Sequence, residues 1–318
     1  MLRVNSAICL FLTTFLCSAA AQAEVQVLTS IKPLQLIAAA VQDGVGKPDV
    51  LLPPGASPHH YALRPSDIRR VRDAQLMYWI GPELESFLPR VMAQRERPSV
   101  AVQTLAGLKL QHFDEPDMHE AHEAHEAHDH SSDEHDHDHQ PGSLDVHLWL
   151  NPVNAQVIAA RMAADLSAAD PANAERYQAN LAAFSERLKT LDARLKNRLI
   201  AAEGKPYFVF HEAYNYFENA YGLEHAGVFS VLGEVQPGAR HVDAMRERLQ
   251  EAGPACVFSE PPFVPRLAKT LTADLPVNLA VLDPMGAELS ASATGYETLM
   301  DNLANDLTQC LSNLPAAK

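Results

Sequence analysis

Long apolar runs are almost missing from this chain of 318 residues. The only candidate lies at the start, where Arg3 precedes an apolar stretch at residues 7–15. That stretch is shorter than the ~20 residues that a membrane-spanning helix needs. Ala21-Gln22-Ala23 then has the small-residue pattern of a signal-peptide cleavage site. We therefore expect residues 1–23 to be a secretory signal peptide cleaved near Ala23, and the remainder to be an exported soluble protein.

Cysteine is also scarce. Cys9 and Cys17 lie within the expected signal peptide, so the mature chain would keep only Cys256 and Cys310. These two lack the paired C-x-x-C spacing from which cysteine zinc sites are built. In an oxidising compartment, two remaining cysteines are expected to form one disulfide, and the alternative is a pair of buried free thiols.

Positive charge is in deficit, and the common motifs of hydrolases are missing. Lysine and arginine number 25 against 40 acidic residues, for a net charge of −15, which makes nucleic acid an unsuitable partner. No G-x-S-x-G nucleophile motif occurs. His211 and Glu212 begin the H-E-x-x-H pattern of zinc hydrolases, but Asn215 stands where the second histidine should be. We therefore expect a protein that is not an enzyme.

Histidine, by contrast, is concentrated in one tract at residues 111–143. Nine of the fifteen histidines lie between His112 and His139, interleaved with acidic residues. Imidazoles and carboxylates are ligands of zinc and similar metals, whereas a segment with so few large apolar side chains cannot form a core. We expect a flexible insertion that binds zinc weakly, and the alternative is a solvated acidic loop without function. Its candidate ligands are His119, His122, His125, His128, His130, His135, His137 and His139.

Outside the tract, short apolar runs alternate with helical stretches, which is typical of parallel strands joined by crossover helices. Between two such regions, apolar side chains recur at steps of three and four over residues 172–201, which predicts a helix about 45 Å long. The expected fold class is therefore α/β, with two similar lobes that each contain a mostly parallel sheet flanked by helices. The predicted boundaries are 24–171 for the first lobe, 172–203 for the linking helix and 204–318 for the second lobe.

Four side chains lie at or near predicted strands: His59 follows the strand at 50–52, His147 lies in one at 145–150, His211 ends one at 207–210, and Asp283 closes one at 277–282. Ligands of open α/β sheets bind beyond the carboxyl ends of the strands, so these four are expected to meet in a crevice between the lobes. Three imidazoles and one carboxylate would suit tetrahedral Zn²⁺. Taken singly, each histidine is equally compatible with a structural or surface role.

Several motifs occur in a fixed order over nearly the whole mature chain. They are Gly55-Ala56-Ser57-Pro58-His59, Leu63-Arg64-Pro65-Ser66-Asp67, His147-Leu148-Trp149-Leu150-Asn151-Pro152, Phe210-His211-Glu212-Ala213-Tyr214-Asn215-Tyr216-Phe217, Glu234-Val235-Gln236-Pro237-Gly238-Ala239 and Leu282-Asp283-Pro284-Met285-Gly286. Together they resemble the metal-binding (cluster A-I) substrate-binding proteins of ABC transporters. The histidine-rich insertion resembles that of the zinc-uptake branch of this family.

The resemblance implies that the two lobes are joined by one long rigid backbone helix and that the metal ligands are His59, His147, His211 and Asp283. It implies Zn²⁺ as the cargo, a periplasmic location, a monomer, and delivery to an inner-membrane ABC permease and its ATPase. A periplasmic zinc chaperone is a further candidate partner. The resemblance also matches Cys256 and Cys310 to a disulfide of the second lobe.

At the first and fourth ligand positions, the sequence leaves more than one candidate ligand. His60 stands where relatives often have an acidic residue and is a candidate to assist His59, whereas water replaces Asp283 in some relatives. His225 and His241 match no ligand motif and are interpreted as surface or helix-end residues.

The third ligand position separates zinc from manganese. Manganese-binding relatives have a carboxylate there, whereas this chain has His211. Imidazole suits Zn²⁺, and Mn²⁺ prefers oxygen ligands. The sequence thus predicts zinc capture for a transporter. The alternatives are a manganese-binding homologue and a periplasmic zinc buffer or metallochaperone without a transporter.

Overall fold

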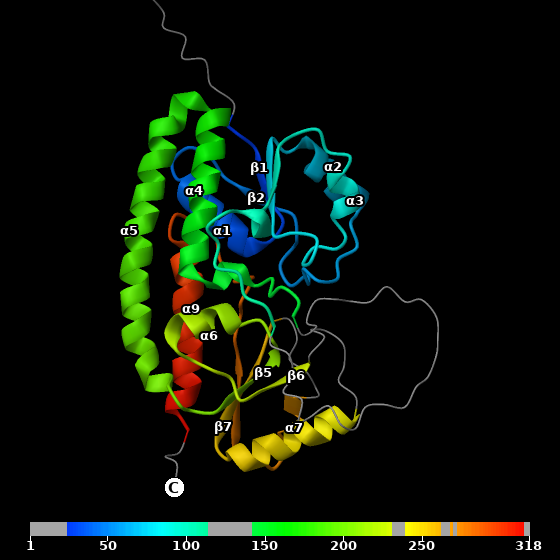
Figure 1. Ribbon diagram of the computed structural model, residues 1–318, viewed down its shortest axis with the longest axis vertical. Helices are drawn as coiled ribbons and strands as arrows, with labels where there is room; N and C mark the ends of the chain where they lie inside the picture. The colour runs from blue at the N-terminus through cyan, green and yellow to red at the C-terminus, as the bar shows by residue number, and fades with distance from the viewer. Residues whose placement is uncertain (1–23, 114–141, 231–238, 262–267, 270–271, 315–318) are drawn as a thin grey trace, which may run out of the picture.

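The computed structural model describes residues 24–113, 142–230, 239–261, 268–269 and 272–314 (Figure 1). The expected signal peptide therefore lies outside the described residues. So do the candidate ligands of the histidine-rich tract from His119 to His139.

A parallel four-stranded sheet forms the N-terminal part of the fold, in the order β2-β1-β3-β4. Its strands β1 and β3 are buried along their whole length, as expected for parallel strands covered on both faces. The elements are β1 (Val27–Thr29), α1 (Lys32–Val41), β2 (Asp49–Val50), α2 (Pro65–Asp73), β3 (Leu76–Trp79), α3 (Pro89–Met92) and β4 (Ser99–Ala101). Helices α2 and α3 flank this sheet on the side away from α1 and α4 (Figure 1).

A second parallel four-stranded sheet forms the C-terminal part, in the order β6-β5-β7-β8. Its elements are β5 (Tyr207–His211), α6 (Asn215–Tyr221), β6 (Gly227–Ser230), α7 (Ala239–Ala252), β7 (Ala255–Ser259), β8 (Val277–Val281) and α9 (Gly295–Ser312). The predicted α/β class with two similar parallel sheets is therefore confirmed.

The predicted linking helix is α5 (Ala174–Leu199), extended at its ends by short 3-10 turns (Figure 1). Its buried face follows the predicted apolar spacing, with Tyr177, Phe184, Leu188, Leu191, Leu195 and Leu199 among the buried side chains. Arginines on the neighbouring face bind α9: Arg187 pairs with Glu297, and Arg194 Nη2 lies 2.6 Å from Asp301 Oδ2. The long helix therefore packs against α1 and α4 of the N-terminal part and is fastened to α9, the last helix of the chain.

Two parts of the chain differ from the sequence-based interpretation. Helix α4 (Pro152–Ala169) was not recognised, because its many alanines give little contrast between the buried and exposed faces. The strand expected at residues 145–150 is instead an irregular segment that leads into a 3-10 helix, Leu148–Leu150. The segment is not part of either described sheet, and the backbone N–H of His147 donates to the carboxylate of Asp145 at 2.9 Å instead of to a neighbouring strand.

The expected disulfide joins Cys256 to Cys310, whose Cα atoms are 6.1 Å apart. Cys256 lies in β7 and Cys310 in the last turn of α9. The bond therefore ties the C-terminal sheet to the helix that packs against α5. Over the part of the chain that the structure describes, no helix has both the length and the apolar character required to cross a membrane.

His225, expected to be a surface or helix-end residue, lies a few residues after the end of α6 and is largely buried. Its side chain is only 15% exposed, and its Nδ1 lies 2.9 Å from Oε2 of Glu218, which is 5% exposed. Burial lowers the pKa of His225, but the hydrogen bond and charge of Glu218 outweigh this, so the net pKa is raised above its usual value. The nearly buried carboxylate of Glu218 therefore favours the charged form of the imidazole.

This pair predicts a pH-dependent contribution to stability. The pKa of His225 is higher in the folded protein than its value near 6.5 in the unfolded chain, so protonation stabilises the folded state. This stabilisation is fully present at pH values below 6.5. It is lost as the pH rises through the folded-state pKa. Urea unfolding of the metal-free protein should show that His225→Gln costs about 1–2 kcal/mol at pH 5.5 and clearly less at pH 8.5. A cost for His225→Gln that does not change with pH would contradict the charged pair.

Candidate metal centre

Three of the four predicted ligands converge in the structure. His59 lies in the loop between β2 and α2, His147 lies directly before the 3-10 helix, and His211 is the last residue of β5. The ring centroids are 5.6 Å apart for His59 and His147, 5.2 Å for His59 and His211, and 4.9 Å for His147 and His211. Residues separated by up to 152 positions thus form one cluster of imidazoles, since His211 and His59 differ by 211 − 59 = 152.

The cluster has the dimensions of a metal site. One ring nitrogen from each histidine lies within 4.8 Å of the other two. Nitrogens bonded to tetrahedral zinc at about 2.0–2.1 Å are about 3.3–3.4 Å apart, so side-chain shifts on the order of 1 Å would complete the bonds. His59 and His147 are 6% and 2% exposed, and the His211 side chain is 14% exposed. Such burial favours a dehydrated ion held by the protein over a loosely bound surface ion.

Two of the three histidines form a hydrogen bond with a carboxylate through their Nδ1 atom. The first is His147, which is oriented by Asp145. Its Oδ1 lies 2.8 Å from Nδ1 of His147, which leaves Nε2 to face a metal. Asp145 is fully buried, and this burial raises the pKa of its carboxyl to about 7, although the N–H of His147 opposes the shift. A cation bound to His147 would favour the ionised carboxylate. The sequence reasoning gave Asp145 no role, although it stands only two residues before a predicted ligand.

Glu260 orients the second histidine and was also missed. Its Oε1 lies 3.1 Å from Nδ1 of His211. Glu260 follows β7, the strand that pairs directly with β5, so its side chain emerges at the same sheet edge as His211. The rule that placed ligands beyond strand ends would have found Glu260 if it had been applied to every strand.

Asp283 and His60 are arranged differently from the three histidines. Asp283 follows β8, and its carboxylate accepts three backbone N–H groups, from Met285, Gly286 and Ala287, each at 2.9 Å. The carboxylate therefore caps the turn in which it lies. His60 is exposed. Within the described residues, neither joins the cluster of ligand atoms formed by the three histidines.

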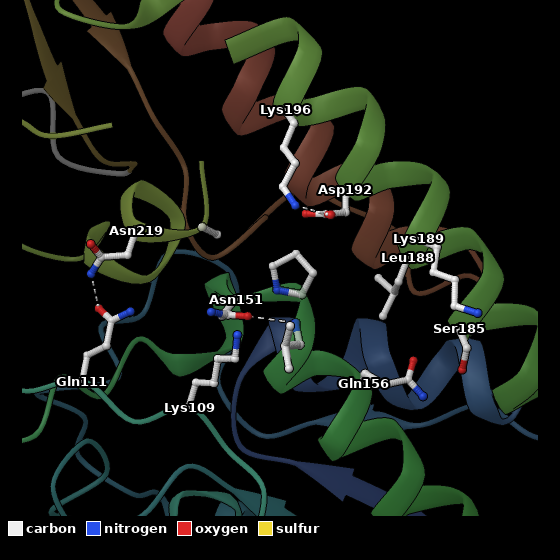
Figure 2. A pocket seen from close by; sticks show the side chains of 13 residues that line it. Lys109, Gln111, Asn151, Gln156, Ser185, Leu188, Lys189, Asp192, Lys196 and Asn219 are labelled. Atoms are coloured by element: carbon white, nitrogen blue, oxygen red, sulfur yellow. Dashed lines mark hydrogen bonds and ion pairs between the residues drawn. The ribbon is translucent and has the colours of Figure 1, made fainter. Parts of the chain in front are cut away.

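A separate cleft of about 620 Å³ lies beside the linking helix (Figure 2). The cleft is lined by Lys109 of the N-terminal part, by Gln156 of α4 and by Asn219 of α6. Its other side is lined by Lys189 and Lys196 of α5. None of the four predicted metal ligands borders this cleft. The imidazole cluster is therefore not part of this cleft.

Comparisons with known proteins agree with this architecture. The family described as "Zinc-uptake complex component A periplasmic" (ZnuA) matches residues 27–310, and the chain belongs to this family. A Yersinia pestis relative named "High-affinity zinc uptake system protein ZnuA" is 40% identical over 292 residues, which cover 91% of this chain and 92% of the relative. A Brucella suis relative with the same name is 38% identical over 321 residues, which cover 95% and 96%.

Solved structures share the fold at lower sequence identity. A crystal structure of ZnuA superposes with a TM-score of 0.73 at 22% identity, covering 91% of this chain and all of the other. The protein FpvC from Pseudomonas aeruginosa, solved in complex with Mn²⁺, superposes with a TM-score of 0.71 at 21% identity, covering 91% and 99%. These likenesses concern the fold alone.

Proposed function

We propose that this protein captures Zn²⁺ between its two parallel sheets and supplies it to a zinc uptake system in the periplasm. The convergence of His59, His147 and His211 within ligand distance of one another carries this proposal. The zinc uptake named for relatives 34–40% identical to this chain supports it. A cluster of buried imidazoles backed by carboxylates is suited to hold a borderline divalent ion, which is what such a carrier requires.

The donor set favours zinc over manganese. Three neutral imidazoles suit Zn²⁺, whereas Mn²⁺ prefers oxygen ligands and higher coordination numbers. Cu²⁺ and Ni²⁺ would also bind imidazoles, so metal supply contributes to the choice among these ions. We therefore propose zinc as the cargo and do not favour the manganese-binding alternative.

We propose Asp283 as the fourth ligand, with His60 or water as the alternatives. A carboxylate offers about four lone-pair sites, and three backbone N–H groups use three of those on Asp283. One site is then left for a cation. This N–H cap also holds the carboxylate in place, so that little side-chain freedom is lost when the ion binds.

The proposed partners are an inner-membrane ABC permease with its ATPase, to which the protein would deliver zinc as a monomer that carries out no catalysis. A periplasmic zinc chaperone is a further candidate partner. The alternative is a periplasmic zinc buffer or metallochaperone that serves no transporter. Growth of a deletion strain in zinc-depleted medium distinguishes these roles, because loss of a transporter component should stop growth until zinc is added back. Normal growth of that strain would favour the buffer.

We propose that the histidine-rich tract is an auxiliary site of low affinity, and the residues that flank it allow a clean test. The N–H of Gly142 donates to the carbonyl of Phe113 at 2.8 Å, and the N–H of Phe113 donates to Ser143 at 3.0 Å. The first of these is the pattern that closes a β-turn when two residues lie between donor and acceptor. Two glycines can therefore replace residues 114–141 without moving the flanking backbone.

This deletion should lower the number of zinc ions bound and leave the tightest site unchanged. Calorimetric zinc titration of the full chain and of the two-glycine variant measures both quantities. A variant with the same length of glycine and serine in place of residues 114–141 controls for the loss of chain. Loss of high-affinity binding in the deletion variant would instead make the tract the primary site.

A further inference from the structure

The segment from Asp145 to Trp149 carries His147 and precedes the linking helix in the sequence. Nevertheless, buried side chains from the part of the chain after α5 bind its two ends. The hydroxyl of Tyr216, in α6, donates to the carbonyl of Asp145 at 3.0 Å. The hydroxyl of Tyr296, in α9, donates to the carbonyl of Trp149 at 2.8 Å. His147 thus lies midway between two anchors that belong to the opposite half of the molecule.

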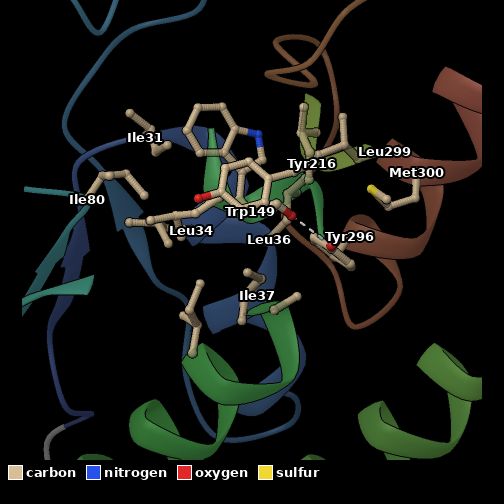
Figure 3. Packing of buried hydrophobic residues seen from close by; sticks show 14 of the residues in the cluster. Ile31, Leu34, Leu36, Ile37, Ile80, Trp149, Tyr216, Tyr296, Leu299 and Met300 are labelled. Atoms are coloured by element: carbon tan, nitrogen blue, oxygen red, sulfur yellow. Dashed lines mark hydrogen bonds between the residues drawn. The ribbon is translucent and has the colours of Figure 1, made fainter. Parts of the chain in front are cut away.

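A third contact joins the same segment to the neighbour of Asp283. The indole N–H of Trp149 donates to the carbonyl of Pro284 at 2.9 Å. Trp149, Tyr216 and Tyr296 are all 0% exposed, so water cannot replace the lost partner when one of these bonds is removed. Figure 3 shows Trp149 with Tyr216, Tyr296 and Leu299 in the same buried cluster.

The anchors connect to the imidazole through a short chain of contacts. Tyr216 binds the backbone of Asp145, and the carboxylate of Asp145 binds both the N–H of His147, at 2.9 Å, and its Nδ1, at 2.8 Å. At the other end, the Trp149 ring packs edge-on against the His147 ring, with centroids 5.4 Å apart. Movement of either anchor would therefore change the position of His147.

We propose that Tyr216 and Tyr296 are positioning residues that hold His147 in a fixed position relative to His211. These two imidazoles are then already arranged as a pair before the metal binds. His59, in a loop of the N-terminal part, then completes the site from the opposite side. This inference rests on the proposed zinc site. Two tyrosines that are far apart in the sequence would thus hold the same metal ligand.

Tyrosine-to-phenylalanine variants test the proposal with little change in packing. Tyr216→Phe and Tyr296→Phe each remove one hydroxyl and keep the ring. Tyr177→Phe is the matched control, because Tyr177 is also 0% exposed and its hydroxyl donates to Asp170 at 3.0 Å, away from the segment. We expect Tyr216→Phe and Tyr296→Phe each to raise the zinc dissociation constant roughly 10-fold, as removal of groups that orient ligands does in other zinc sites. Tyr177→Phe should leave the constant unchanged.

Cobalt substitution separates positioning from general destabilisation. The visible d–d spectrum of bound Co²⁺ reports the geometry of the ligands, and it should change in Tyr216→Phe and Tyr296→Phe but not in Tyr177→Phe. The melting temperatures of the three metal-free variants serve as the measure of simple destabilisation. If the zinc constant and the cobalt spectrum of Tyr216→Phe and Tyr296→Phe match those of Tyr177→Phe, the positioning role is overturned.

The outcome also distinguishes this inference from the proposed function. If His147→Ala weakens zinc binding while the two tyrosine variants do not, the zinc site stands and only the anchors are wrong. If the wild-type protein has no tight zinc site, the proposed function fails before the anchors are tested.

Discussion

Replacing His147 or His211 with alanine should weaken zinc binding by roughly 100- to 1000-fold. Four-ligand structural zinc sites have binding free energies of about 10–16 kcal/mol, or about 2.5–4 kcal/mol for each ligand, and each 1.4 kcal/mol corresponds to a factor of ten. Both histidines are held by carboxylates at their second ring nitrogen, so they are oriented before the ion binds. Little of the lost binding energy can therefore be recovered by rearrangement.

Calorimetry in competition with a chelator measures this effect, because direct titration does not resolve very tight binding. His112→Ala is the control, since His112 is exposed and lies outside the cluster. Asp283→Asn and His60→Ala, measured in parallel, decide which of the two serves as the fourth ligand. Affinity near that of the wild type in His147→Ala and His211→Ala would remove the proposed site.

Removing the disulfide should be the largest change in stability. The double variant Cys256→Ala/Cys310→Ala is expected to lose about 2–5 kcal/mol of unfolding free energy, because the bond closes a loop of 54 positions in the unfolded chain. Alanine is preferred to serine because both cysteines are buried, and a buried hydroxyl would add a cost of its own.

Urea unfolding of the metal-free protein measures this loss, with the wild type under reducing conditions as a second sample. Reduction should bring the wild type to the stability of the double variant and leave the double variant unchanged. Equal stability of the oxidised wild type and the variant would mean that the bond contributes nothing to the fold.

The regular parts of this fold were predictable because each leaves a periodic pattern in the sequence. Buried parallel strands such as β5 and β7 are continuous apolar runs, and α5 has one apolar face over 26 residues. Helix α4 was missed because alanine contributes to a buried face without the contrast that larger side chains give. Residues 145–150 were predicted as a strand, although neither described sheet includes them.

The candidate site was predicted only in part. His59 and His211 follow or end strands as expected, whereas His147 joins the imidazole cluster from an irregular segment and not from the predicted strand. Asp145 carries no motif of its own, whereas Glu260 directly follows β7, where the strand-end rule used for the other residues also applies. The role of Asp283 as a ligand stays a prediction.

Local periodicity, composition and chemistry were enough to predict most of the regular elements, the two cysteines that pair and the types of side chain available for a metal. Which side chains meet depends instead on long-range packing. The three histidines come together from a loop, an irregular segment and the end of β5, and Tyr216 in α6 and Tyr296 in α9 bind the backbone on either side of His147. Such contacts depend on how distant elements are oriented in space, and no spacing along the chain encodes that orientation.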